Sequence, residues 1–227
     1  MAQSILVVAE SGCGKSTAIE TLNPAETFII NVANKPLPFK GWKKKYIPFD
    51  LSTKKGNIAN VSKPSDIEAV LKVINNERKD VKSVVIDDFQ YMSAFEYFNR
   101  ASEKGFDKFT QMGAALTHIA KLPILMRDDL MVFYLTHAEE AVDLEGKRKV
   151  KAKTIGKLVD DKLTLEGLYS IVLFGKVKKN KDGDLRYIFE TQNNSENTCK
   201  SPREMFSSFE IANDLQFVRD SIIAYEN

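Results

Sequence analysis

The sequence predicts an α/β fold, in which a mostly parallel central sheet is flanked by helices and is followed by an antiparallel hairpin and a final helix. Three observations lead to this fold class. Apolar runs alternate with segments of helical pattern, which is typical of parallel strands joined by helices. A small-residue loop separates the first apolar run from the first helical segment. Turn residues at 181–184 separate the last two runs, as in a hairpin. The expected strands cover 4–9, 27–32, 81–88, 130–137, 169–177 and 185–191.

Helices are expected where apolar residues recur every three or four positions, as at Ile67, Val70 and Ile74. The first helix should end at Pro24, and Asp214 should cap the last. The expected helices cover 15–22, a segment starting at 63–66, 89–100, 108–126 with a break near Pro123, 155–163 and 214–225. Two stretches should be irregular: 34–63, apart from a short strand at 45–49, and the charged residues 138–154, which we expect to be a mobile loop.

Bulk composition indicates one globular domain spanning 1–227. Hydrophobic residues make up 43% and charged residues 28% of the 227 positions, and the net charge is +2. No overall basic field is therefore present, so any nucleic acid would have to bind a local patch. The sequence has no apolar run of membrane-spanning length. A disulfide at Cys13 would obstruct the loop that carries it, so we expect a reducing, cytoplasmic setting.

Residues 9–17 match the phosphate-binding loop G-x-x-x-x-G-K-[ST], except that Ala9 replaces the first glycine. Glycines in this loop allow the backbone N–H groups to turn inward around a phosphate. The following helix would add the positive end of its dipole. Lys15 would reach the β- and γ-phosphates of ATP, and the Ser16 hydroxyl would bind Mg²⁺. The expected nucleotide-binding residues are Glu10, Ser11, Gly12, Cys13, Gly14, Lys15, Ser16 and Thr17.

Two carboxylates, Asp87 and Asp88, end the apolar strand at 81–88. Ligands of open α/β sheets bind beyond the carboxyl ends of the strands, so this pair should lie near the phosphates. Asp87 is expected to hold Mg²⁺ through water. Asp88 would orient or deprotonate the attacking water, although capping of the next helix explains it equally well.

Thr136 and His137 end the strand after that one. A polar side chain at this position can sense the γ-phosphate, and His137 is expected to donate a hydrogen bond to it. The alternative is a polar residue where a strand meets solvent. His118 lies beside apolar residues of a predicted helix and is expected to be a packed or surface residue.

Two segments are candidates for binding single-stranded DNA. Residues 147–153 hold five cations, which could grip a phosphate backbone; the alternative for the whole segment 138–154 is a solvated loop. Residues 99–109 mix cations with Phe106 and Phe109, which suits stacking on bases. We favour packing of these two phenylalanines in the core. Lys200 or Arg203 could reach a neighbouring subunit's nucleotide in a homo-oligomer, with surface solvation as the alternative.

Taken together, these motifs resemble those of RecA-like P-loop ATPases carried by bacteriophages, some of which have an AAA domain or are single-strand annealing recombinases. The resemblance implies binding and hydrolysis of ATP with Mg²⁺, assembly on single-stranded DNA and, if the chain is phage-encoded, a place in the host cytoplasm. One departure is that 31–35 lacks the glutamate that such proteins often carry there. The resemblance rests on 11–17, 85–88, 135–137, 154–160, 189–192 and 211–215.

Three other functions remain open. Residues 86–90 look like the equivalent strand of an AAA+ loader or initiator ATPase, which would end in a helical lid. A small-molecule kinase would carry an arginine-rich lid, whereas the cations at 147–153 are mostly lysines. A nucleotide-gated binding module with little turnover would fit Ala9 and the missing glutamate.

Overall fold

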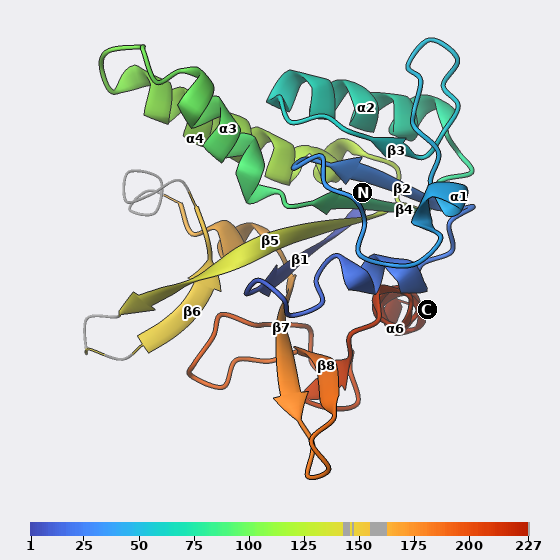
Figure 1. The fold of residues 1–227 in the computed structure, drawn as a ribbon, viewed down its shortest axis with the longest axis vertical. Helices are drawn as coiled ribbons and strands as arrows, with labels where there is room; N and C mark the ends of the chain where they lie inside the picture. The colour runs from blue at the N-terminus through green and yellow to red at the C-terminus, as the bar shows by residue number, and fades with distance from the viewer. Residues whose placement is uncertain (143–145, 147, 155–162, 227) are drawn as a thin grey trace.

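The computed structural model describes residues 1–142, 146, 148–154 and 163–226. Its centre is a sheet in the order β3-β2-β4-β5-β1-β7-β8-β9, with β6 pairing with β5 (Figure 1). The predicted α/β fold class is confirmed. The strands are β1 (Gln3–Ala9), β2 (Thr27–Asn31), β3 (Ile58–Ala59), β4 (Ser83–Asp87), β5 (Met131–Val142), β6 (Arg148–Ala152), β7 (Ile171–Lys179), β8 (Leu185–Glu190) and β9 (Glu210–Ala212).

Along the sheet, β3, β2, β4, β5, β1 and β7 are parallel to one another, whereas β8 and β9 extend the sheet in the antiparallel direction. β1 lies between β5 and β7, so β5 separates it from β4. The predicted hairpin joins β7 to β8, and Gly183 has a φ of 92° at its turn. β9 was not predicted, because three residues are too few to give a strand pattern.

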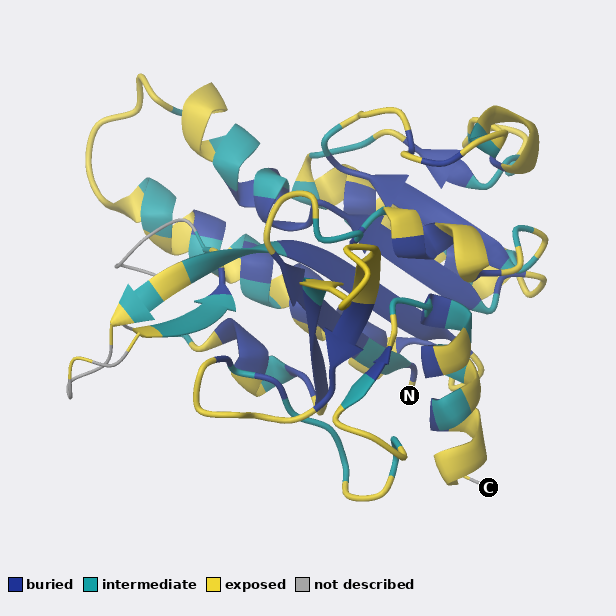
Figure 2. Ribbon diagram, turned by 60° about the horizontal axis from the view of Figure 1, so that its bottom comes forward, coloured by how far each residue is buried: buried dark blue, intermediate teal, exposed yellow. Residues whose placement is uncertain are grey.

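Helices cover both faces of the sheet. One face packs against α2 (Pro64–Glu77), α3 (Gln90–Asn99) and α4 (Asp107–Lys121), and the other against α6 (Leu215–Glu226). In β1, Leu6 and Val8 face the first layer, and Ile5 and Val7 face the second. Figure 2 shows the resulting buried strands between helices with exposed outer faces. The chain has no described helix that is both long and apolar enough to cross a membrane.

The helix expected at 15–22 is much shorter than predicted. Only a five-residue 3₁₀ turn, η1 (Thr17–Thr21), follows the glycine loop. Asn23 and Pro24 end the segment early, and the Thr21 side chain is used elsewhere: its Oγ1 accepts hydrogen bonds from the N–H groups of Leu215 and Gln216, at 3.0 and 3.2 Å. Thr21 thereby caps α6, together with Asp214, which accepts from the Phe217 N–H at 2.9 Å.

Two loop predictions are also wrong. The strand expected at 45–49 is replaced by the short helix α1 (Trp42–Lys45) and a single bridge from Pro48 to Ile58. Pro48 has no N–H group, so it cannot continue a ladder. The expected mobile loop at 138–154 is largely a two-stranded arm, because β5 continues to Val142 and pairs with β6. The helix expected at 155–163 falls almost wholly outside the described residues.

Candidate functional site

Four segments meet at one edge of the parallel sheet. β1 ends at Ala9, level with His137 on β5, and β2 ends at Asn31, level with Asp87 on β4. The glycine loop after β1 and the loop after β2 therefore lie on opposite sides of the carboxylates that follow β4. This is the carboxyl-end crevice where open α/β sheets bind ligands.

A cavity of about 350 Å³ opens between these segments. Most of the predicted loop residues line it, together with both carboxylates and His137. Glu10 and Cys13 do not line it; Glu10 faces a neighbouring cavity instead. The lining residues are Ser11, Gly12, Gly14, Lys15, Ser16, Thr17, Lys35, Pro36, Pro38, Asp87, Asp88, His137 and Tyr187.

The loop has the backbone shape that a phosphate cradle requires. Gly12 and Gly14 have φ values of 82° and 80°, in the left-handed region that side chains disfavour. An added Cβ at Gly14 would lie 2.9 Å from Tyr187 Cδ1 and 3.2 Å from Asn213 Oδ1. Ala9, the departure from the motif, is accommodated by β7: a Cβ added at Gly175 would lie 2.9 Å from the Ala9 Cβ.

Ser16 and Asp87, the two residues expected to bind a metal, are in direct contact. The Ser16 hydroxyl donates to Asp87 Oδ1 at 2.8 Å. Burial, followed by the charge of Asp88, raises the pKa of Asp87 to about 6. A cation beside this carboxylate would relieve both effects. Oxygen donors of this kind fit Mg²⁺, which takes few protein ligands and completes its shell with phosphates and water. Among the described residues, no group of three or more His, Cys, Asp or Glu side chains could hold a metal by itself.

Lys15 is almost fully buried at the base of the cavity. Burial lowers the pKa of its ammonium group, and the charges of Asp88 and Asp87 act in the opposite direction. The two carboxylates therefore offset part of the cost of burying this cation.

Asp88 is the most heavily engaged side chain of the site. It is 1% exposed and has a φ of 59°, an uncommon value for a residue other than glycine. Its Oδ2 pairs with the Lys35 ammonium group, and its Oδ1 lies 3.3 Å from His137 Nε2. Burial raises the pKa of Asp88, but the interactions with His137 and Lys35 outweigh it and hold the pKa below its usual value. Asp88 does not cap α3 through its side chain.

His137 is held in place by Gln90, the first residue of α3. The Gln90 side-chain oxygen accepts from the His137 N–H and from the Thr136 hydroxyl, both at 3.1 Å. Thr136 is fully buried, so its hydroxyl serves this contact rather than a ligand. The His137 ring also lies edge-on to Tyr91, with centroids 5.9 Å apart.

Sequence reasoning missed three polar residues of the site, Lys35, Gln90 and Tyr187, and also the lining residues Pro36 and Pro38. The pairing of strands brings them there, so local pattern gave little sign of them. Lys35 follows β2, which is separated from β1 by the two strands β4 and β5. Tyr187 comes from β8, far along the chain. Gln90 alone carried a signal, as a polar residue directly after the carboxylate pair.

A second cavity, of about 800 Å³, lies between α3 and the start of the arm. Tyr97 and Phe98 line one side, and Glu139 and Lys153 line another. Glu139 pairs with Lys151 at 3.3 Å, and Glu140 lies 3.8 Å from Arg148. His137 lines both this cavity and the cavity of about 350 Å³ beside the glycine loop, so the two cavities share a wall.

The favoured core packing of Phe106 and Phe109 is wrong. Phe106 is 78% exposed at the tip between α3 and α4, as is Phe98 at 71%, and Phe109 is only half-buried. The tip is too far from the sheet for these rings to reach either core. Lys108 lies 5.4 Å from the Phe109 ring centroid. His118, as expected, lies on the surface, 3.1 Å from Glu68.

The two other predicted cations lie away from the phosphate cavity. Lys200 pairs through its backbone with Val172 on β7, and Arg203 is exposed in the loop before β9. Neither lines the cavity of its own chain.

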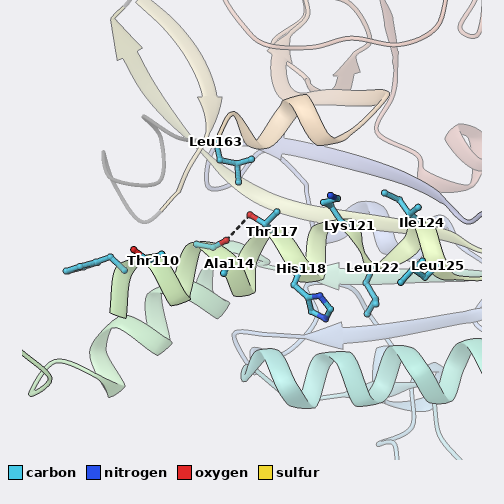
Figure 3. Close-up of a pocket in the computed structure, with 11 residues that line it drawn as sticks. Thr110, Ala114, Thr117, His118, Lys121, Leu122, Ile124, Leu125 and Leu163 are labelled. Atoms are coloured by element: carbon cyan, nitrogen blue, oxygen red, sulfur yellow. Dashed lines mark hydrogen bonds between the residues drawn. The ribbon is translucent and has the colours of Figure 1, made fainter. Parts of the chain in front are cut away.

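A third cavity, of about 1020 Å³, runs along α4 and is mostly apolar (Figure 3). Leu163 faces α4 across it, and Ile124 and Leu125 lie at one end. The hydroxyl of Thr117 donates within α4, to the Gly113 carbonyl at 2.8 Å. Of the described residues that line it, only His118 and Lys121 are ionisable.

Comparison with known proteins finds no matching family model and no matching curated protein. Among solved structures, the genome packaging NTPase B204 of Sulfolobus turreted icosahedral virus 2, in complex with ATP-gammaS, is similar to this chain. The match covers 80% of this chain and 78% of the viral protein, with a TM-score of 0.41 and 10% identity. At that level of similarity, the residues of the site itself have to support any functional conclusion.

Proposed function

We propose that this chain is a P-loop ATPase that binds ATP with Mg²⁺ and hydrolyses it. One observation carries the proposal: the glycine loop, the Ser16–Asp87 pair and Asp88 line a single cavity. Each alone has a plain structural explanation. Their convergence from separate strands gives a phosphate cradle, a metal site and a general base within one crevice.

The chemistry assigned to the residues is an in-line displacement. A water oxygen bonds to the γ-phosphorus while the bond from that phosphorus to the bridging oxygen breaks, and ADP leaves with the electron pair. Asp88 orients the water and takes its proton. Lys15 and the loop N–H groups stabilise the charge on the phosphates. His137 acts as a positioning residue for Asp88. Ser16 and Asp87 would hold Mg²⁺, which would neutralise further charge on the phosphates.

ATP turnover by the wild type and by Lys15→Ala, with Mg²⁺ and with or without single-stranded DNA, tests the proposal. We expect turnover by the wild type and a loss of at least about a hundredfold in Lys15→Ala, because a donor to transition-state charge is removed. Tight binding without turnover under any condition would identify a nucleotide-gated binding module instead.

We further propose that this ATPase acts on single-stranded DNA. Support comes from the exposed aromatic rings of the tip and from the cavity of about 800 Å³ beside it. Stacking on aromatic rings together with nearby cations is how proteins hold single strands without sequence preference. The arm lysines, defined as Lys149, Lys151 and Lys153, supply cations on the other side. Since His137 lines both cavities, a bound strand could influence Asp88.

The expected homo-oligomer belongs to the same proposal, with Lys200 or Arg203 reaching a neighbour's nucleotide. Restored turnover on mixing Lys15→Ala with Arg203→Ala or Lys200→Ala protein would support it. An AAA+ loader is less favoured, because β7, β8, β9 and α6 occupy the described C-terminal part in place of a helical lid.

A further inference from the structure

We infer that Lys35 is a cation supplied by the chain's own β2 loop to the γ-phosphate, so that it discriminates ATP from ADP. The inference rests on the proposed function. Lys35 lines the phosphate cavity on the β2 side, whereas Lys15 lines it on the β1 side. The carboxylates of Asp87 and Asp88 lie between them.

The backbone around Lys35 is built to present its side chain. Asn31, buried at the end of β2, closes the turn: its Nδ2 donates to the Lys35 carbonyl at 2.8 Å, and its Oδ1 accepts from the Lys35 N–H at 3.3 Å. Asn34 takes a φ of 52°, and Pro36 restricts Lys35 to an extended backbone. A buried asparagine, a left-handed residue and a proline thus fix where this lysine leaves the chain.

The side chain itself remains free to change partners. It forms an ion pair with Asp88, yet the Lys35 side chain is 55% exposed whereas that of Asp88 is 1% exposed. Because the lysine is half-exposed, its ammonium group can reach the cavity, and a γ-phosphate, which carries more charge than one carboxylate, competes with Asp88 for it. His137 remains beside Asp88 after that transfer.

The same movement would connect the γ-phosphate to the general base. While Lys35 stays on Asp88, one carboxylate oxygen is occupied and cannot orient a water. When Lys35 moves to the γ-phosphate, that oxygen becomes available. ADP, which lacks this group, leaves Lys35 on Asp88. Lys35 thus lies in the segment 31–35, where the sequence lacks the glutamate that RecA-like proteins often carry.

Calorimetric titration of the full chain with ATPγS and with ADP, both with Mg²⁺, tests the inference in Lys35→Met. We expect the affinity for ATPγS to fall by about tenfold to a hundredfold, with the affinity for ADP changed less than threefold, since one charge-assisted contact is lost. Lys35→Arg should keep most of the preference. Lys40→Met, an exposed lysine of the same loop outside the cavity, is the matched control and should change neither affinity.

Equal losses for both nucleotides, or no loss for either, would overturn the role of Lys35 and leave the proposed function intact. Wild-type protein that binds neither nucleotide would overturn both. Thermal unfolding without nucleotide checks for a folding defect: Lys35→Met removes a partner of buried Asp88 and should melt below Lys40→Met, but in a single cooperative transition.

Discussion

Replacing Gly14 with alanine should weaken the fold and the phosphate site together. Its φ of 80° lies in the left-handed region, where a Cβ costs about 1–2 kcal/mol. The new methyl group would also lie 2.9 Å from Tyr187 Cδ1, so the ring has to move. Overpacking of this kind adds about 1–3 kcal/mol.

Gly12→Ala provides a matched control within the same loop. Gly12 has nearly the same φ, 82°, but no other atom lies within 4 Å of its added Cβ. Gly12→Ala should therefore lose only the stability that a Cβ costs in the left-handed backbone region. The difference between the two variants measures the contacts of the new methyl group with Tyr187 on β8 and with Asn213, which local sequence pattern does not reveal.

Urea unfolding without nucleotide measures this difference. We expect Gly14→Ala to be less stable than Gly12→Ala by about 1–3 kcal/mol, or by at least about 2 °C in Tm for a chain of this size. Tyr187→Ala in the Gly14→Ala background should restore part of the difference. Equal stability of the two glycine variants would refute the packing of Tyr187 on the loop.

Three further predictions concern ligands. Asp87→Asn keeps an acceptor for the Ser16 hydroxyl but removes a buried charge, so the free energy of unfolding without nucleotide should stay the same or increase. The Mg²⁺-dependent rise in Tm with ATPγS should disappear. A preserved rise would remove Asp87 from the metal site. Phe98→Ala should weaken binding of a fluorescent oligothymidine by about 1–3 kcal/mol, and Phe217→Ala, an exposed ring on α6, should not; equal effects would exclude stacking at the tip. Replacing the three arm lysines with alanine should flatten the salt dependence of that binding by about 0.7 per lost phosphate contact, and Lys179→Ala should leave it unchanged; an unaltered slope would exclude the arm.

How much the sequence could predict depended on how local each signal was. The glycine loop and the carboxylate pair were predictable because each is a short pattern at the end of one strand. The position of Lys35 was not predictable, since it depends on the pairing of β2 with β4, in which Asn31 lies opposite Asp87. The arm was read as a loop because its alternating charges resemble a solvated segment. Across the hairpin, however, Glu139 lies opposite Lys151, which stabilises a strand pair.

The short turn after the glycine loop changes how a phosphate would be held. A long helix would offer aligned peptide dipoles, but η1 has five residues and its Thr21 side chain is committed to α6. Most of the positive charge must therefore come from the loop N–H groups, Lys15 and Lys35. Both lysines lie beside carboxylates, so the charges of the crevice's own side chains are balanced rather than strongly positive. Binding then requires the lysines to exchange carboxylates for phosphates, and this exchange gives the γ-phosphate an influence on Asp88 that a fixed helix dipole would lack.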